Sequence, residues 1–155
     1  MTDVVSNAKD FQSAIMEFEK RLDDEESSVK GKALDDLCPV THEYGDGCYI
    51  RTIFMPKGML LTSKIHKVLH PYFVMKGKCT VFTENGKEEI EAPFRGMTKP
   101  GTKRLIHVLE DCIWSTVHVT KETELDKIEE EIIAKTFDEC LPLQDEKEKL
   151  LCHGQ

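Results

Sequence analysis

The spacing of hydrophobic residues divides the chain into three parts. Residues 7–23 carry apolar side chains at helical spacing. The stripe is formed by Phe11, Ile15, Phe18 and Leu22. This pattern predicts an amphipathic helix that packs its apolar side against the rest of the molecule. The charged segment after it predicts a break, and residues 32–37 predict one further helical turn.

From Val40 to Val119 the period changes to two, which is the period of a strand whose two faces have different surroundings. The strand candidates are CYIRTIFM, KIHKVLHPYFVMKG, KCTVFTE, KEEIEAP, KRLIHVLE and CIWSTVHVT. Asn85 and Gly86 lie between two of these runs and predict a hairpin in which both turn residues adopt a positive φ. Many short strands joined by Gly and Pro turns predict a sandwich or a barrel.

Helical spacing returns after Thr120. Its stripe consists of Leu125, Ile128, Ile132 and Phe137. This predicts a helix over residues 123–137, and Thr123 with Asp126 resembles a capping box. We therefore expect one mainly β domain with a helix at each end. Its parts are an N-terminal helical segment over 1–37, a β-barrel over 38–120, and a C-terminal helix with an acidic tail over 121–155.

Composition narrows the possible partners. The formal net charge of −8 opposes binding to a nucleic acid polymer or to an anionic membrane, since both favour a cationic surface. No apolar run reaches the length of about 18 residues that a membrane-spanning helix needs. The N-terminus shows no signal peptide, so we expect a cytoplasmic protein. The six cysteines form no C-x-x-C pair and are expected to be reduced and mostly buried.

Evenly spaced polar residues lie between Gly58 and Gly77. Lys64, His66 and His70 differ by even numbers, so an extended strand points them to one face, which in a barrel is the interior. An ideal strand holds the two histidines about 13 Å apart, so their convergence on one ligand requires a bend or a bulge. The proline at position 71 marks a place for that distortion.

This segment resembles the first motif of the cupin family, in which Gly, His-x-His, Glu and Gly follow at fixed intervals. Both glycines fall in register; His66 occupies one ligand position, His70 replaces the glutamate, and Lys64 replaces the other histidine. A protonated lysine binds no metal. The second cupin motif is matched by PGTKR, with Gly101 in register and Arg104 at the fourth ligand position. The planar fork of an arginine suits a phosphate or a carboxylate.

Three short strings together resemble a group of small cupin-like proteins of tailed phages and prophages. The strings are KIHKVLH, PGTKR and EDCIWSTVH, and the resemblance spans residues 38–137. It implies a single cupin jelly-roll β-barrel with an N-terminal and a C-terminal α-helix. For a phage-encoded protein it also implies the cytoplasm of a bacterial host.

A further histidine is a candidate for the same site. His118 shares a strand face with Trp114, and with His66 and His70 it would form a three-imidazole site for one divalent ion: Zn, Fe, Mn or Ni. The alternative for His118 is a strand-end residue near solvent. Trp114 either stacks on a ring of the ligand or belongs to the core. Two more histidines are interpreted as structural or surface residues: His42 and His107.

The functional hypotheses fall into different classes. The first is a binding module for a small anionic ligand, nucleotide- or sugar-phosphate-like, which would sequester a host metabolite or signal. Its ligand-binding residues would be Lys64, His66, His70, Arg104, Trp114 and His118. The alternative is a metal-dependent enzyme of isomerase, hydrolase or oxygenase type, with His66, His70 and His118 on the metal. A third is a structural or regulatory oligomer, and a homodimer or larger homo-oligomer is expected. For Arg104 and Lys64, a pair on the surface is the competing interpretation.

Overall fold

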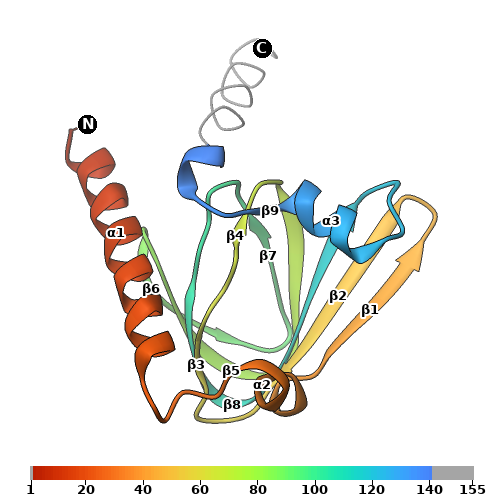
Figure 1. The fold of residues 1–155 in the computed structure, drawn as a ribbon, viewed down its shortest axis with the longest axis horizontal. Coiled ribbons are helices and arrows are strands. Elements are labelled where there is room, and N and C mark those ends of the chain that lie inside the picture. The colour runs from red at the N-terminus through yellow and green to blue at the C-terminus, as the bar shows by residue number, and fades with distance from the viewer. Residues whose placement is uncertain (1, 141–155) are drawn as a thin grey trace.

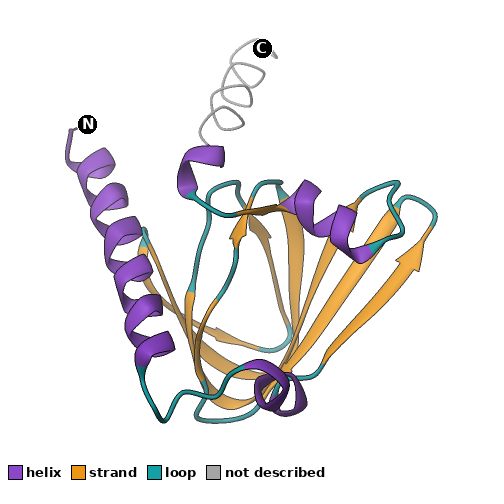
Figure 2. Cartoon of the chain, in the orientation of Figure 1, coloured by secondary structure: helices purple, strands orange, loops and turns teal. Residues whose placement is uncertain are grey.

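The computed structural model describes residues 2–140, with side chains from residue 8 onward. Antiparallel strands make up most of this part, and the helices lie around them (Figures 1 and 2). The helices are α1 (Thr2–Asp24), α2 (Gly31–Leu37), α3 (Leu125–Ile132) and the 3-10 turn η1 (Phe137–Cys140). The strands are β1 (Val40–Gly45), β2 (Cys48–Met55), β3 (Leu60–Thr62), β4 (Ile65–His66), β5 (His70–Thr83), β6 (Gly86–Glu91), β7 (Phe94–Thr98), β8 (Leu105–Val119) and β9 (Ile133–Ala134).

One curved antiparallel sheet contains most of the strands. Its path of paired strands is β1-β2-β8-β5-β6, while β3 pairs with β8 and β7 pairs with β5. The short strands β4 and β9 pair with each other. The prediction of a mainly β fold with helices at both ends is therefore confirmed. Within residues 2–140 the path ends at β1 and β6, which do not pair with each other, so these hydrogen bonds do not close the predicted barrel.

Two long strands replace four of the expected short ones. β5 joins the end of KIHKVLHPYFVMKG to KCTVFTE, and β8 joins KRLIHVLE to CIWSTVHVT. The register between β5 and β8 shifts between Val74 and Cys79. Gly77 lies there with a φ of 86°, and a Cβ atom on it would overlap the backbone carbonyl of Asp111. Gly77 therefore serves a close approach of two strands rather than a turn, whereas Gly58, with a φ of 89°, does lie in a turn.

The hairpin between β5 and β6 is confirmed, but its turn differs from the prediction. Thr83 pairs with Gly86, so the loop consists of Glu84 and Asn85. Gly86 has a φ of 104°, whereas no residue other than glycine in the described part of the chain has a positive φ. The positive φ predicted for Asn85 is wrong, because one glycine after the loop supplies the left-handed conformation that returns the chain to the ladder.

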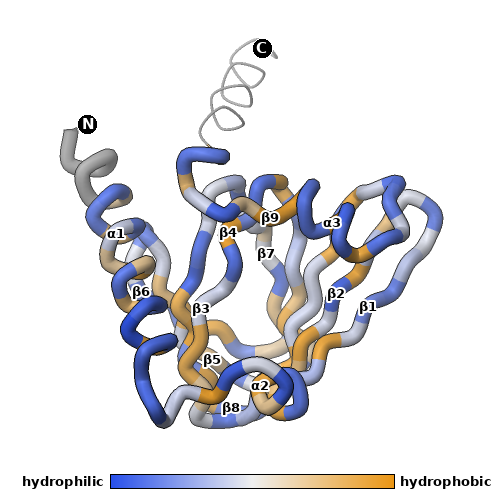
Figure 3. Tube along the Cα trace, in the orientation of Figure 1, coloured by the Kyte–Doolittle hydropathy of each residue, from blue (hydrophilic) through white to orange (hydrophobic). Residues whose placement is uncertain are grey.

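The largest core lies inside the curve of the sheet. Its buried residues are Met55, Tyr72, Val74, Cys79, Val81, Ile90, Ile106, Val108, Cys112 and Trp114. Figure 3 shows hydrophobic positions gathered where β3, β5 and β8 meet beside α2. A second cluster attaches α3 to the sheet through Tyr49, Ile128 and Ile132. The two helices α2 and α3 therefore cover opposite ends of the curved sheet, as Figure 1 shows.

Helix α1 lies along the outside of the sheet, beside β3 and β6 (Figure 1). The apolar stripe predicted for it is confirmed, because Ile15 is buried. The other stripe residues are partly buried: Phe11, Phe18 and Leu22. Next to the stripe, Glu19 accepts hydrogen bonds from Lys103 at 2.8 Å and from Thr62 at 2.6 Å. An ion pair and a hydroxyl thus fix the middle of α1 to the sheet.

Helix α3 is shorter than predicted. It ends at Ile132, and the chain continues as β9, whose extended backbone pairs with β4. Phe137 therefore lies in η1 and not on the helix. Glu124 is the N-cap and its side chain makes no capping hydrogen bond, so the capping box predicted from Thr123 and Asp126 is wrong. Because α3 ends at Ile132, the next two residues can take an extended backbone and pair with β4.

Five cysteines lie in the described residues, and all are free thiols. Four of them are buried, as expected: Cys38, Cys79, Cys112 and Cys140. Cys48 is partly exposed. Cys152 and the acidic tail beyond residue 140 lie outside the described residues. No helix in residues 2–140 has the length and apolar composition to cross a membrane.

Candidate functional site

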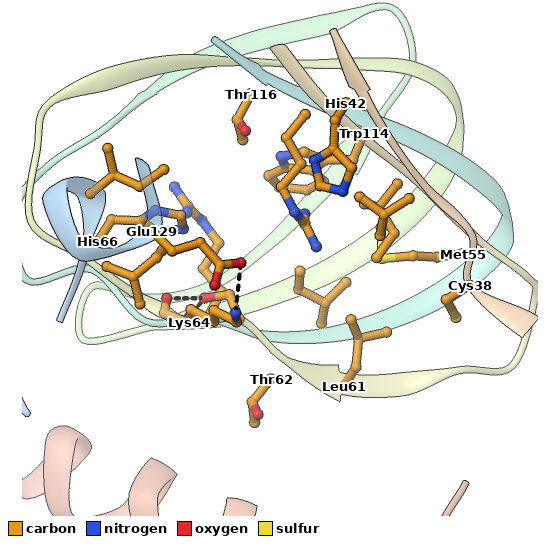
Figure 4. Close-up of a pocket in the computed structure, with 18 of the residues that line it drawn as sticks. Cys38, His42, Met55, Leu61, Thr62, Lys64, His66, Trp114, Thr116 and Glu129 are labelled. Atoms are coloured by element: carbon orange, nitrogen blue, oxygen red, sulfur yellow. Dashed lines mark hydrogen bonds and ion pairs between the residues drawn. The ribbon is translucent and has the colours of Figure 1, made fainter. Parts of the chain in front are cut away.

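A cavity of about 470 Å³ lies on the concave side of the sheet. Its wall comes from β1, β2, β3 and β8, with α2 at one end and α3 at the other. Alternate residues of β2 point into it: Tyr49, Arg51, Ile53 and Met55. Figure 4 shows side chains from several strands directed into this space. A cavity of this volume is within the range of sites that hold small molecules.

The end of the cavity next to α3 brings together the imidazole cluster, defined as His66, His70 and His118. The ring centroids lie 4.6 Å apart for His66 and His70, 4.2 Å for His70 and His118, and 6.2 Å for His66 and His118. The bend expected from the strand spacing lies in residues 67–69, where β4 ends and β5 has not begun. The chain therefore turns before Pro71, and both histidines reach the same place from different strands.

Backbone bonds hold His66 at the edge of the cavity. It pairs with Ile133 of β9, and its carbonyl accepts a hydrogen bond from the Gly101 amide at 2.8 Å. The register of the sheet brings His70 and His118 together: Tyr72 pairs with Thr116 on antiparallel strands, so the position two residues before Tyr72 on β5 lies opposite the position two residues after Thr116 on β8. His66 and His118 line the cavity, whereas His70 lies behind them.

Each fully buried ring has one nitrogen with a partner and one without. His70 Nδ1 donates to the carbonyl of Val68 at 2.8 Å, and His118 Nε2 lies 3.1 Å from the hydroxyl of Thr116. Within the described residues, His70 Nε2, His118 Nδ1 and His66 Nδ1 are buried and have no hydrogen-bond partner. Buried polar atoms are normally paired, so three such nitrogens in one place suit contact with a ligand or with water.

Burial lowers the pKa of all three imidazoles, to about 2 for His66 and to about 3 for His118. The other rings of the cluster contribute to the low pKa of His66, because two charged imidazoles would repel each other. The cluster is therefore neutral at neutral pH. Its free nitrogens can offer lone pairs or N–H groups, but not a positive charge.

The donor chemistry of the imidazole cluster suits a metal ion, but its arrangement does not. Metal-bound imidazoles direct in-plane lone pairs at one point about 2.1 Å from each nitrogen. Among residues 2–140, no group of three or more His, Cys, Asp or Glu side chains is arranged to hold a metal ion.

Arg104 reaches the cavity from the segment before β8 and is 7% exposed. Its guanidinium lies 4.8 Å from the ring centre of Tyr72 and 5.7 Å from that of Trp114. One of its N–H groups donates to the hydroxyl of Thr98 at 3.1 Å. In the described part of the chain no carboxylate forms an ion pair with it. The aromatic rings, the hydroxyls of Thr98 and Tyr72 and the more distant charges of Glu84 and Glu88 compensate this buried cation.

Arg51 is a second cation in the cavity wall, and the sequence analysis did not select it. It points inward from β2 between Tyr49 and Ile53, opposite Thr116. Within residues 8–140 it forms no ion pair either. Burial lowers the pKa of Arg51 and of Arg104, but a guanidinium keeps its charge in proteins. The signal was available, since a basic residue interrupts the apolar face of CYIRTIFM.

Lys64 lies at the rim of the cavity. Its ammonium is exposed and pairs with Glu129 of α3 at 3.4 Å, as the dashed line in Figure 4 shows. Trp114 belongs to both the core and the wall: it is 6% exposed, and it stacks on Tyr72 with ring centroids 4.7 Å apart. The rim lysine is thus already paired, while the deeper arginine is not.

The other histidines divide between the wall and the surface. His107 is exposed, as expected. His42 is exposed, as expected, and it also contributes to the cavity wall, with its Nδ1 2.8 Å from the hydroxyl of Tyr49. Burial raises the pKa of Tyr49 to about 12, and this ring also stacks on His118 at 5.8 Å.

No protein-family model matches the chain, and no curated protein matches it. Several solved structures of cupins match part of it. A cupin superfamily protein from Desulfitobacterium hafniense is 9% identical, with a TM-score of 0.47 over 60% of this chain and 84% of that one. The cupin domain of Cnp3 from Schizosaccharomyces pombe is 13% identical, with a TM-score of 0.46 over 52% of this chain and 59% of that one.

An enzyme is among the similar structures. The DMSP lyase DddQ from Ruegeria pomeroyi is 12% identical, with a TM-score of 0.48 over 61% of this chain and 53% of that one. Matches at these identities bear on the fold alone, and at these scores they establish neither a family nor an activity. The resemblance to phage proteins stays a prediction.

Proposed function

We propose that this chain is a cupin-like binding protein whose cavity holds a small anionic ligand between Arg51 and Arg104. The observation that carries the proposal is that both guanidiniums line one cavity and neither is paired with a carboxylate of the described residues. Withdrawing a cation from water without a counter-charge costs free energy, so an anion that contacts both arginines would offset much of that desolvation cost.

The geometry of an arginine supports this choice. A guanidinium offers parallel N–H donors that match the two oxygens of a carboxylate or of a phosphate. The guanidinium of Arg104 packs against the stacked rings of Tyr72 and Trp114, and a guanidinium carries five N–H groups, so donors remain for a ligand. The neutral imidazoles of His66 and His118 add uncharged hydrogen-bonding atoms to the same wall. Retention without turnover would suit sequestration of a metabolite or signal.

The test is a binding titration of the purified full-length chain with acetate and inorganic phosphate as probes, followed by calorimetry. Trp114 is the sole tryptophan of the chain and lines the cavity, so its emission provides a second readout. We expect Arg51→Gln and Arg104→Gln to weaken binding at least tenfold. Arg95→Gln is the matched control, because Arg95 is an exposed arginine on β7.

Equal affinities for the wild type and both cavity variants would contradict the proposal, as would an equal loss in Arg95→Gln. The melting temperature of each variant shows whether it is folded. Arg51→Gln is the more informative change if Arg104→Gln unfolds, because it leaves the contact of Arg104 with the stacked rings of Tyr72 and Trp114 in place.

The alternative, a metal-dependent enzyme, is favoured by one observation: the imidazole cluster contains three buried nitrogens without partners. His66, His70 and His118 would hold the ion, which would act as a Lewis acid or activate water. Among residues 2–140 no group of three or more His, Cys, Asp or Glu side chains is arranged to hold a metal ion, so we assign no reaction step to a metal.

Elemental analysis after dialysis against Zn²⁺, Fe²⁺, Mn²⁺ or Ni²⁺ separates the two candidates. About one ion per chain, lost in His118→Gln but retained in His107→Gln, would favour the enzyme. Both histidines lie on β8, and His107 is the exposed one. Metal uptake that is equal in both variants, or absent from the wild type, would contradict a metal site at the imidazole cluster.

A further inference from the structure

We infer that the ligand of this cavity is an amphipathic monoanion: a small carboxylate that carries an apolar chain or ring. The inference rests on the proposed anion site and adds what the rest of the ligand must be. It comes from the order in which polar and apolar residues follow one another along the cavity.

The sheet register divides the wall into rows, since residues paired across antiparallel strands lie on the same face. The row nearest α3 contains Tyr49, paired with His118. The next row contains Arg51, paired with His42 on one side and with Thr116 on the other. Successive rows lie two residues apart, or roughly 7 Å. Arg51 therefore lies one row below Tyr49 and His118.

The row after the arginine is apolar. Ile53 pairs with Val40 and with Trp114, and all three line the cavity. Met55 follows on the same strand face, and Leu34 of α2 lies at this end. Other apolar wall residues are Leu61 and Ile106, together with Leu125, Ile132 and Ile133 at the end next to α3, while the carboxylate of Asp35 lies on α2. Figure 3 shows hydrophobic positions gathered beside α2.

An inorganic phosphate or a sugar phosphate would leave this apolar end filled with water or empty. An acid group at Arg51 and Arg104 with an apolar chain directed toward Ile53 and α2 would cover it. Removal of apolar surface from water contributes affinity in proportion to the area buried, so the wall favours a ligand with such a tail.

The charge of the wall indicates a monoanion. Its cations are Arg51, Arg104 and Lys64, and its carboxylates are Asp35 and Glu129. Three positive charges against two negative ones leave a single positive charge when the histidines are counted as neutral. A carboxylate balances that charge, whereas a phosphate dianion exceeds it. This differs from the nucleotide- or sugar-phosphate-like ligand expected from the sequence.

The experiment is a calorimetric titration of the full-length protein with acetate, butyrate and hexanoate, with hexyl phosphate, inorganic phosphate and hexanol for comparison. We expect affinity to rise roughly three- to fourfold for each added methylene until the apolar end is filled. We also expect hexanoate to bind more tightly than hexyl phosphate and hexanol.

A matched pair of variants tests the direction of the tail. Ile53→Thr changes the apolar row, whereas Ile50→Thr makes the same change on the same strand at a residue outside the cavity wall. We expect Ile53→Thr to reduce the gain from acetate to hexanoate while leaving acetate affinity unchanged. Ile50→Thr should preserve the whole series.

The outcomes separate this inference from the proposed function. Affinities for acetate and hexanoate that are equal, or a stronger preference for either phosphate, would overturn the amphipathic monoanion and leave the anion site intact. Three results would overturn the anion site itself: hexanol binding as tightly as hexanoate, no binding of any anion, or hexanoate binding that Arg51→Gln leaves unchanged.

Discussion

Two consecutive residues, Lys103 and Arg104, are both buried cations, and the protein treats them differently. Lys103 is 4% exposed and Arg104 is 7% exposed. Lys103 turns toward α1, where its ammonium donates to the carboxylate of Glu19 and to the carbonyl of Ser63, each at 2.8 Å. Arg104 turns toward the cavity, where it meets the hydroxyl of Thr98 and aromatic faces.

The difference separates a structural charge from a functional one. The ion pair of Lys103 is complete within the described chain, so it serves to attach α1 to the sheet. Arg104 forms no ion pair with a carboxylate of the described residues, and neither does Arg51 in the same cavity wall, where the charge of Glu129 acts only from a longer distance. The sequence PGTKR shows two adjacent basic residues, and their similar burial does not distinguish their roles. Their interaction partners in the folded chain distinguish them.

The largest effect is expected at Arg104. We expect Arg104→Ala to weaken binding of a carboxylate by about 2–5 kcal/mol, since removing one partner of a buried charge pair has a cost of this order. Calorimetry measures the affinity, and circular dichroism checks that the variant is folded. Unchanged affinity in a folded variant would make Arg104 a structural residue like Lys103.

The next effect concerns stability without binding. Glu19→Gln leaves the buried Lys103 with a neutral acceptor, so we expect the free energy of unfolding to fall by about 1.5–3 kcal/mol. Urea denaturation measures it. Glu17→Gln on the same helix is the control, because its pair with Arg21 is exposed and worth at most about 1 kcal/mol. A similar fall in both variants, or a loss of carboxylate affinity in Glu19→Gln, would remove the distinction.

Lowering the pH is expected to destabilise the fold through the buried histidines of the cavity, and not through Lys103 or Arg104. The pKa of His118 is lowered to about 3 and that of His66 to about 2 in the folded chain, from 6.5. Below pH 6.5 these two histidines are protonated in the unfolded chain but stay neutral in the folded chain. The free energy of unfolding therefore falls as the pH falls toward 3. The slope is about 1.4 kcal/mol per pH unit for each neutral imidazole.

Denaturation at several pH values in the presence of a chelator measures this slope. Replacing the imidazole with an uncharged amide in His118→Gln should lower the slope by about one proton, whereas His107→Gln should not. A slope that does not change in His118→Gln would mean that His118 is protonated in the folded chain.

The smallest effect is ligand stabilisation. At ten times its dissociation constant, a bound carboxylate should raise the free energy of unfolding by about 1.4 kcal/mol. We expect Glu19→Gln, though less stable, to keep this increment, and Arg51→Gln to lose most of it at the same ligand concentration. Thermal denaturation with and without the carboxylate is the measurement. Loss of the increment in both variants would indicate that the two regions are coupled.

Local patterns were sufficient for most of the fold. The stripe around Ile15 and the alternation of CYIRTIFM placed α1 and β2 correctly because each has one buried face. VTHEYG was not recognised as β1, since five of its six positions are exposed and no apolar alternation marks it. The helix expected to reach Phe137 ends at Ile132 because β9 pairs with a distant strand, which no local pattern reveals.

The site was predicted in part, for a similar reason. Even spacing around His66 and the alternation of β8 indicated that His66, His70 and His118 share an interior, and the structure brings their rings together. Arg51 was not predicted, because it lies outside the two segments that resemble cupin motifs. The pairing of Lys64 with Glu129 joins residues 65 positions apart, so only the folded chain shows that its charge is already partly balanced.

A crystal structure of the protein with hexanoate tests the central claim most directly. The account places the carboxylate within hydrogen-bond distance of both Arg51 and Arg104, with the alkyl chain directed toward Ile53 and α2. A cavity that contains only water at saturating hexanoate, or hexanoate bound with its carboxylate away from both arginines, would contradict it.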